Sequence, residues 1–480
     1  MDLLHDYPQF QPNRLLFDGT GYNYHPYTNT ELLLPNTEPN WAESTLQNDP
    51  IHIERYAMIN NIRDSSGCLF LNHHCYVGNV TSEMLLERYS LLFDNVAKQH
   101  LIDDYFIDGE IADSAENARN YFGLITAITL KETQGNNKVE LILKAAQTNQ
   151  DAVRGFRAIS EAFQREIIIY EKILTELVMF QRNFSISNPF EGIPRYYGSV
   201  HEALLMDNLK VSGYQLWNHW RPMDFDHMSL IVQEYAKLHA VSLAYGNKYP
   251  NKFKELIKSI KNNFLEQREA KNPELYQHQR DVVFKVCKKA VQNNATALKA
   301  VEKFKMKYLS FWNENKTNPE EDVLVVCHGD CHPGNILIKY KDIKIPEKIC
   351  LIDWQLSSAA SPIRDLSFAL FTCASKEVLL RSNDLLELYH KIIEKNLREF
   401  GCEPAHVFSY SKFMEHWNKY FIYGLYRAVV VLKITLIAPE EQGNGSILDV
   451  IKKDFLPSSI FANRTCDLFE TIGEKWLNEM

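Results

Sequence analysis

The chain has 480 residues, 45% hydrophobic and 24% charged, which is the composition of an ordinary globular protein long enough for two or three packed units. Its formal net charge of −9 and the lack of a long basic stripe argue against nucleic acid as a partner, because phosphate binding needs clustered Lys and Arg. Nine scattered cysteines without a C-x-x-C pair, an N-terminus without a signal-peptide pattern and no apolar stretch of membrane-spanning length predict a cytoplasmic protein with no membrane partner.

The first 78 residues are rich in Asn, Pro, Tyr and Thr and show little hydrophobic periodicity. This composition predicts a loosely ordered N-terminal extension. Two Cys and two adjacent His near its end do not have the spacing of a closed zinc site, so no metal is assigned to them: Cys68, His73, His74 and Cys75.

Regular patterns begin after the extension. Apolar residues recur at helical spacing over residues 81–97, which predicts a helix. Residues 122–130 and 139–143 have strand patterns, and the Gln-Gly-Asn-Asn sequence between them is typical of a hairpin turn. Lys144 ends the second strand, and the amphipathic helix that follows carries Glu166.

The rest of the chain is mainly helical by pattern. Two short strands over residues 196–206 come before a helix over residues 225–245, for which Asp226 is the candidate N-cap. Over residues 250–315, Lys-rich faces alternate with apolar ridges, which predicts surface helices. Further helices are predicted after Pro362 and over residues 378–400, 408–437 and 468–477.

The most informative stretch is residues 328–335, with the sequence His-Gly-Asp-Cys-His-Pro-Gly-Asn. It lies between two short apolar runs, and the second run is followed directly by Asp353. Two strands that present polar residues at their ends suit phosphoryl transfer, which needs positioning and charge neutralisation more than covalent help. An Asn five residues after an Asp can reach a metal ion from the same loop. Asp330, Asn335 and Asp353 are therefore candidate catalytic residues, with Asn335 and Asp353 as candidate Mg²⁺ ligands.

Other chemistries fit this run less well. Its His-x-Asp-x-His pattern resembles the ligands of a binuclear hydrolase, but that site needs further His ligands and leaves Asn335 and Asp353 unexplained. Cys331 as a nucleophile lacks an evident neighbouring base. We expect His328 to hydrogen-bond the backbone near Asp353 and so to fix the loop.

Two segments carry a family resemblance. Residues 328–335 resemble the catalytic loop of the aminoglycoside/choline kinase superfamily, and residues 351–366, Leu-Ile-Asp-Trp-Gln-Leu-Ser-Ser-Ala-Ala-Ser-Pro-Ile-Arg-Asp-Leu, resemble the ecdysteroid kinase-like group, also called the choline-kinase-like domain family. The resemblance covers roughly residues 100–440. It implies an α+β, bilobal, protein-kinase-like fold with a small β-rich N-lobe over residues 79–206 and a larger, mainly helical C-lobe over residues 207–480.

The resemblance also implies what individual residues do, with ATP and Mg²⁺ as cofactors. Asp330 would orient the acceptor hydroxyl and accept its proton, and Lys144, steadied by Glu166, would contact the nucleotide phosphates. The remaining implied residues support the site or contact adenine: His328 and Asp365 at the catalytic loop, and Met206 and Leu209 at the hinge between the lobes.

The chain departs from the family in the loop that covers the phosphates. Ala118 stands where Gly is expected, and Gly123 stands where Ser is common. Backbone N–H groups cradle phosphate only where the chain approaches closely, and a Cβ atom restricts that approach. Arg119 or Asn120 would supply side-chain donors instead, and Asn120 is included among the candidate nucleotide-binding residues.

These patterns predict a kinase that transfers the ATP γ-phosphate to a small-molecule alcohol. The resemblance favours an ecdysteroid or other lipophilic alcohol, with choline or ethanolamine as alternatives. Ala118 leaves a catalytically weak pseudokinase or nucleotide-binding scaffold open. A protein kinase is disfavoured, because the chain has no Ala-Pro-Glu segment after Asp353 and has Asp-Trp-Gln in place of Asp-Phe-Gly. The helix over residues 408–437 has an aromatic stripe at core-like spacing, and the resemblance also makes this helix a wall of the acceptor pocket.

Overall fold

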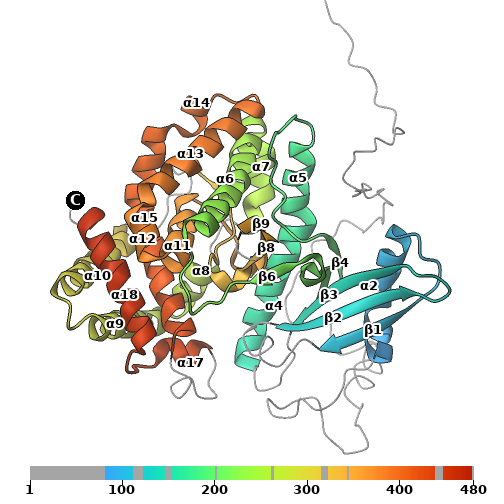
Figure 1. Ribbon diagram of the computed structural model, residues 1–480, viewed down its shortest axis with the longest axis horizontal. Coiled ribbons are helices and arrows are strands. Elements are labelled where there is room, and N and C mark those ends of the chain that lie inside the picture. Colours follow the sequence, from blue (N-terminus) through green and yellow to red (C-terminus); the bar gives the residue numbers. More distant parts are fainter. Residues whose placement is uncertain are drawn as a thin grey trace, which may run out of the picture. The chain divides into compact units, whose positions relative to one another are not determined.

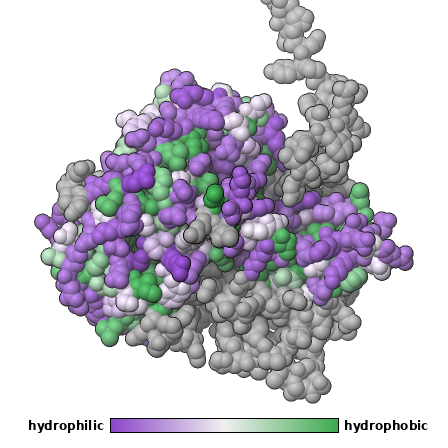
Figure 2. Space-filling model, in the orientation of Figure 1, coloured by the Kyte–Doolittle hydropathy of each residue, from purple (hydrophilic) through white to green (hydrophobic). Residues whose placement is uncertain are grey.

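The computed structural model describes residues 82–111, 123–146, 153–200, 203–260, 264–314, 323–342, 345–437 and 447–477. The predicted extension with its Cys and His cluster, and the phosphate-covering segment with Ala118 and Asn120, lie outside these residues. Among the described helices, none combines the length and the apolar character needed to cross a membrane. The visible face of the described part is mostly hydrophilic, with apolar residues scattered over it (Figure 2).

A five-stranded antiparallel sheet forms the smaller lobe, with the strand order β1-β2-β3-β5-β4 (Figure 1). β2 and β3 form the predicted hairpin, in which Leu130 lies opposite Val139. β4 and β5 are the two predicted short strands, whereas β1, which pairs with β2, was not predicted. The strands are β1 (Tyr105–Ile111), β2 (Gly123–Glu132), β3 (Lys138–Ala146), β4 (Tyr196–Val200) and β5 (Ala203–Asp207).

The predicted first helix, α2 (Ser82–Gln99), closes the core of this sheet by packing against β1 and β4. Its buried Leu92 and Phe93 share one apolar cluster with Leu141 and Leu143 of β3. Alternate residues of β3 point to opposite faces of the sheet, so these two leucines face the same side.

The helix that carries Glu166 contains a π-helical segment. α4 (Val153–Ile168) continues through a π-helical segment (Ile169–Leu174) into α5 (Thr175–Gln181). Buried Tyr170 lies in the π-helical segment, and Thr175 Oγ1 donates a hydrogen bond to its carbonyl oxygen at 2.7 Å. Such segments often occur next to functional sites.

The larger lobe is built around α6 (Phe225–Lys248), whose residues from Tyr235 to Tyr245 are all buried. The helix begins at Phe225, and Asp224 caps it by accepting a hydrogen bond from the His227 N–H at 3.1 Å. The prediction of Asp226 as the N-cap was wrong, because Asp226 lies inside the first turn, where it has no cap position to fill.

Helices surround α6, with α13 packed along it, α11 along α15, and α18 along α10. The predicted surface helices of residues 250–315 expose charged side chains such as Lys285 but bury apolar ones such as Val283 and Phe304. The helices are α7 (Pro250–Ile257), α8 (Phe264–Lys271), α9 (Pro273–Ala290), α10 (Ala295–Glu314), α11 (Ile363–Cys373), α12 (Lys376–Leu380), α13 (Ser382–Glu399), α14 (Pro404–Phe408), α15 (Tyr410–Thr435), α17 (Ile447–Lys452) and α18 (Ser459–Lys475).

Two small sheets in this lobe hold the stretch that the sequence singled out. One has the order β6-β8-β9 and the other pairs β7 with β10. The polar loop of residues 328–335 joins β7 to β8, and Asp353 follows two residues after the end of β9. These strands are β6 (Tyr214–Leu216), β7 (Val325–Cys327), β8 (Ile336–Asp342), β9 (Ile345–Leu351) and β10 (Ser358–Ala360). The described residues thus have the bilobal α+β architecture that the sequence predicted.

Candidate active site

The loop between β7 and β8 turns sharply at Gly329, which has a φ of +82°. A Cβ atom at this position would lie 2.2 Å from the carbonyl oxygen of Leu356. Only glycine fits both the left-handed backbone and this close approach. The turn brings the loop against the segment that follows β9.

His328 ties the loop to the end of β9, as the sequence analysis predicted. Its Nε2 lies 2.9 Å from the carbonyl oxygen of Ile352, and its Nδ1 accepts a hydrogen bond from the Asp330 N–H at 3.2 Å. Burial lowers the pKa of His328 below its usual value, which favours the neutral ring that these two contacts require. The Ile352 N–H also donates to the carbonyl oxygen of Asn335 at 3.0 Å, so the loop and the strand end are held together twice.

Asp365, in the first turn of α11, anchors the same loop through hydrogen bonds to its backbone. Its two carboxylate oxygens accept hydrogen bonds from the N–H groups of His328 at 2.7 Å and Gly329 at 2.9 Å. His239 Nε2 lies 3.3 Å from Asp365, a contact that the sequence analysis missed. Burial by itself would raise the pKa of Asp365, but the hydrogen bond and charge of His239 lower it overall, so the carboxylate stays ionised.

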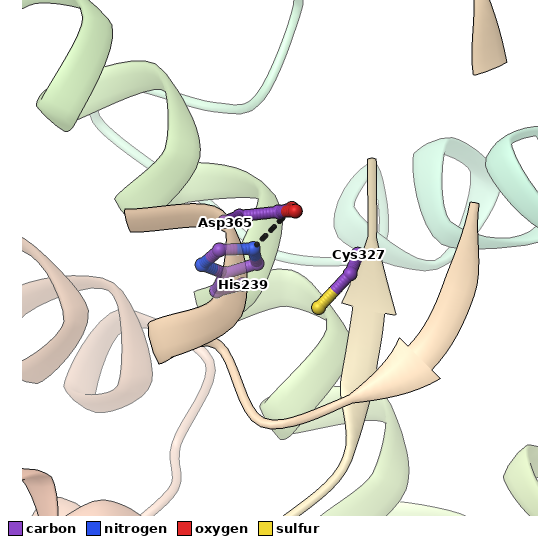
Figure 3. A group of neighbouring side chains, drawn as sticks. All are labelled: His239, Cys327 and Asp365. Atoms are coloured by element: carbon purple, nitrogen blue, oxygen red, sulfur yellow. Dashed lines mark hydrogen bonds and ion pairs between the residues drawn. The ribbon is translucent and has the colours of Figure 1, made fainter. Parts of the chain in front are cut away.

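His239, Cys327 and Asp365 are drawn together in Figure 3, where His239 and Asp365 face each other and the Cys327 sulfur points toward them. One ligand atom from each lies within 4.8 Å of the others, a spacing compatible with a metal ion. Each side chain already has contacts inside the protein, because His239 Nδ1 lies 2.6 Å from the Tyr389 hydroxyl and Cys327 Sγ lies 3.5 Å from the carbonyl oxygen of Ser361. Burial raises the pKa of the Cys327 thiol well above its usual value, which disfavours the thiolate that a metal would need. We therefore interpret the group as internal support for the loop of residues 328–335.

Asp330 is surrounded by groups that favour its charged form. Its Oδ2 accepts from Asn335 Nδ2 at 3.0 Å and lies 3.4 Å from His332 Nε2, and its Oδ1 lies 3.4 Å from an Arg427 guanidinium nitrogen. Burial by itself would raise the pKa of Asp330, but His332 and Arg427 outweigh burial and lower it to about 2. Arg427 lies on α15, almost 100 residues after the loop, and no motif in the sequence pointed to it.

Lys144 joins the two lobes at the other side of the site. From β3, its Nζ donates to Glu166 Oε2 of α4 at 2.7 Å and to Asp353 Oδ1 at 2.9 Å. Burial by itself would lower the pKa of Lys144, but the carboxylates of Asp353 and Glu166 raise it above its usual value. Glu166 Oε1 also accepts from the Trp354 N–H at 3.3 Å, so one glutamate holds both the lysine and the backbone next to Asp353.

Asp353 itself has a left-handed backbone, with a φ of +66°. Such a conformation is uncommon for a non-glycine residue and occurs often at functional sites. Its side chain is 25% exposed, in contrast to the fully buried Glu166, so Asp353 still has access to a ligand.

The structure brings Asp330 and Asn335 together, and it brings Lys144, Glu166 and Asp353 together. Of these contacts, the one between Lys144 and Glu166 is the one that the family resemblance implied. The catalytic and metal-binding roles of these residues stay predictions. Adenine contacts at Met206 and Leu209 also stay predictions: Met206 is buried in β5, and Leu209 begins a short 3₁₀ turn, η3 (Leu209–Ser212), directly after the strand. Asn120 lies outside the described residues.

Fold and site together define a bilobal, kinase-like protein. The model of the Ecdysteroid kinase-like family matches residues 117–402, more than half of the chain, and the chain belongs to this family. No curated protein matches the sequence.

Several solved structures resemble the chain distantly. Choline kinase from Cryptosporidium parvum Iowa II is 12% identical, with a TM-score of 0.41 over 82% of this chain and 96% of that one. The GDP complex of wild-type aminoglycoside 2'-phosphotransferase-IIIa is 11% identical, with a TM-score of 0.35 over 75% and 96%. Plasmodium vivax ethanolamine kinase is 15% identical, with a TM-score of 0.32 over 72% and 88%.

Proposed function

We propose that this protein is an ATP-dependent kinase that transfers the γ-phosphate to the hydroxyl group of a small-molecule alcohol. The observation that carries the proposal is the pair of contacts by which Lys144 bridges Glu166 of one lobe and Asp353 of the other. The polar loop with Asp330 is hydrogen-bonded to the segment that leads to Asp353, which supports an acceptor site next to a phosphate site. Membership of the ecdysteroid kinase-like family supports the same reaction class.

The residues present fit a complex of ATP with Mg²⁺. A Mg²⁺ ion prefers oxygen ligands, and a carboxylate from Asp353 with an amide oxygen from Asn335 would supply them. The Asn335 NH₂ group donates to Asp330, so the carbonyl oxygen of that side chain is the atom left for a metal. Lys144 would bind the phosphates. The bound ion would neutralise charge on the phosphate oxygens during transfer.

In the proposed reaction, the acceptor oxygen forms a bond to the γ-phosphorus while the bond from that phosphorus to the β,γ-bridging oxygen breaks, and ADP leaves. Asp330 accepts the hydrogen bond of the acceptor hydroxyl and finally its proton. With a pKa of about 2, its carboxylate is ionised at neutral pH but only weakly basic. Its main contribution is therefore to orient the hydroxyl, in agreement with the loose transition state of phosphoryl transfer.

As the acceptor we propose a lipophilic alcohol, with an ecdysteroid as the first candidate, because the family description refers to ecdysteroid kinases. Choline or ethanolamine is the alternative acceptor. A second candidate function, a nucleotide-binding scaffold without turnover, is favoured by Ala118, where the phosphate-covering loop is expected to have Gly, and by the N-terminal extension, which lies outside the family match.

The proposal is tested by measuring transfer of labelled γ-phosphate from Mg·ATP to a panel of steroid alcohols and amino alcohols. The wild type is expected to form a labelled organic product, and Asp330→Asn to form it at least about 100-fold more slowly, because the hydroxyl is no longer oriented by a carboxylate. Asp384→Asn is the matched control, since this exposed carboxylate on α13 pairs with Arg381 at the surface.

Equal rates for the wild type and Asp330→Asn would overturn the assignment of Asp330. A wild type that binds ATP but phosphorylates no member of the panel would overturn the proposed kinase in favour of the scaffold.

A further inference from the structure

Arg427 places a fixed positive charge where the acceptor would meet Asp330. Its guanidinium lies 3.4 Å from Asp330 Oδ1, and its side chain is only 13% exposed. It also lies over the Phe368 ring, 5.2 Å from the ring centroid, a contact that helps to hold the guanidinium in place. We propose that Arg427 is a specificity-determining residue that excludes acceptors with a positive charge close to their hydroxyl group. The inference rests on the proposed kinase function and narrows its substrate class to uncharged or anionic alcohols.

Among the described residues, the groups that contact the Asp330 carboxylate offset its negative charge. Arg427 and His332 both contact the Asp330 carboxylate. Glu269 of α8 is paired with Arg280 of α9. A cation that entered beside Asp330 would therefore meet a carboxylate that is already neutralised, together with a guanidinium of like charge, and like charges a few ångströms apart repel strongly in a partly buried site.

Aromatic rings are the other means of binding a cationic alcohol, and several rings of the surrounding helices already carry the protein's own cations. Arg280 lies over the Trp312 ring at 5.4 Å. Arg364 lies over the Tyr423 ring, 4.5 Å from the ring centroid. Tyr423 is on α15, one turn before Arg427.

Two further aromatic rings of these helices cover each other. Tyr308 of α10 and Tyr426 of α15 stack, with their centroids 4.1 Å apart and their planes at 17°. Among the described residues, these rings therefore do not form the open aromatic cage that binds quaternary ammonium groups. An uncharged hydroxyl or an anionic group would instead be compatible with the Arg427 guanidinium.

The test compares matched pairs of alcohols that differ in charge and little in shape. One pair is choline and 3,3-dimethylbutan-1-ol. The other is a 3-hydroxysteroid and an analogue that keeps the hydroxyl and carries an amino group close to it. We would measure kcat/KM for the phosphorylation of each compound. The wild type is expected to prefer the uncharged member by about 10- to 100-fold, as like-charge repulsion in a partly buried site predicts. Arg427→Gln is expected to bring this ratio close to one, whereas Arg427→Lys keeps the charge and most of the preference.

The ratio of the two kcat/KM values separates an effect on specificity from an effect on folding, because a general loss of structure lowers kcat/KM equally for both alcohols of a pair. Two outcomes would overturn this inference and leave the kinase proposal intact. The wild type could phosphorylate the cationic alcohol with the same kcat/KM as the uncharged one, or Arg427→Gln could keep the preference unchanged. A wild type that phosphorylates neither member of any pair would overturn the kinase proposal and this inference with it.

Discussion

Lys144 connects the two lobes, because it is a buried cation that contacts a carboxylate from each. Its side chain is 7% exposed, and its partner Glu166 is fully buried. Replacement by Met leaves the Glu166 carboxylate without its partner. Breaking a buried ion pair in this way costs about 3–5 kcal/mol.

We therefore predict that Lys144→Met lowers the free energy of unfolding by about 3–5 kcal/mol and slows phosphoryl transfer by at least about 100-fold. Denaturant unfolding and the labelled-phosphate assay measure the two effects. The double variant Lys144→Met/Glu166→Gln removes the unpaired charge, so it is expected to regain stability but not activity. A single variant as stable as the wild type would contradict the view that the pair is closely coupled.

Asp365 supports a second prediction, on pH. Its folded pKa lies below its usual value of 3.8, so between these two pH values the unfolded chain binds more protons than the folded one. The stability that Asp365 contributes is therefore fully present above about pH 4 and is lost as the pH falls through the folded pKa. Asp365→Asn is expected to cost about 2–3 kcal/mol at pH 7, because the hydrogen bonds to a charged acceptor are lost.

Urea unfolding of the wild type and Asp365→Asn between pH 7 and pH 3 measures this contribution. The difference in unfolding free energy should shrink below pH 4. A difference that stays constant over the whole range would show that the carboxylate charge is not what anchors the loop.

At the scale of single residues, the sequence was informative where chemistry is local in the chain. Asp330 and Asn335 lie in one short loop, and their spacing was enough to assign both to one candidate site, whereas their hydrogen bond is seen only in the structure. Arg427 and His239 were missed because their partners are distant in the chain: Asp330 lies 97 residues from Arg427, and Asp365 lies 126 residues from His239. A lone Arg or His inside a helical pattern has no distinguishing spacing.

At the scale of elements, Gly329 permits the turn that joins β7 to the catalytic loop. Gly329→Ala is predicted to cost roughly 3 kcal/mol or more, since it adds both a strained φ and a clash with the Leu356 carbonyl. Gly213 is the matched control: it has a similar φ of +85° and nothing within 4 Å of its would-be Cβ. Gly213→Ala should cost only about 1–2 kcal/mol, the penalty of the left-handed backbone alone.

Thermal or urea unfolding of the two alanine variants separates the cost of the left-handed backbone from the cost of the clash with the Leu356 carbonyl. Equal losses of stability in both would mean that the backbone conformation, and not the approach of Leu356, explains the glycine.

Elements were predictable where the pattern was strong and uncertain at their edges. The β2–β3 hairpin followed from two apolar strands around a polar turn, and the structure confirms it. β1 was not predicted because Asp108, Gly109 and Glu110 interrupt its apolar pattern. The segment is a strand because it pairs with β2. The cap of α6 was misplaced because two aspartates, Asp224 and Asp226, stand near the start and only backbone geometry distinguishes them.

At the scale of the whole molecule, the two lobes meet through the segment that follows β9. Lys144 reaches Asp353, Glu166 accepts from the Trp354 N–H, and an Arg165 guanidinium nitrogen donates to the Ser357 carbonyl oxygen at 2.9 Å. Three contacts from β3 and α4 thus hold a short stretch of the larger lobe. No local pattern could have predicted this arrangement, because the partners lie about 190 to 210 residues apart in the chain.

A ligand bound at this junction should stabilise the protein as a whole. Mg·ATP at 100 times its Kd is expected to add about 2.7 kcal/mol to the free energy of unfolding, because it binds only the folded state. Thermal unfolding with ATP, before and after removal of Mg²⁺ by EDTA, would show the share of this gain that depends on the metal.

Asp353→Asn should lose the increment that depends on Mg²⁺, because a neutral amide is a much weaker metal ligand than a carboxylate. Asp384→Asn, which changes an exposed carboxylate on α13 in the same way, should keep the increment. If Asp353→Asn were stabilised by Mg·ATP as much as the wild type, the metal would be held elsewhere, and the assignment of Asp353 would be wrong. If ATP stabilised the wild type equally with and without Mg²⁺, the nucleotide would bind at the junction without the metal, as expected of a scaffold and not of a kinase.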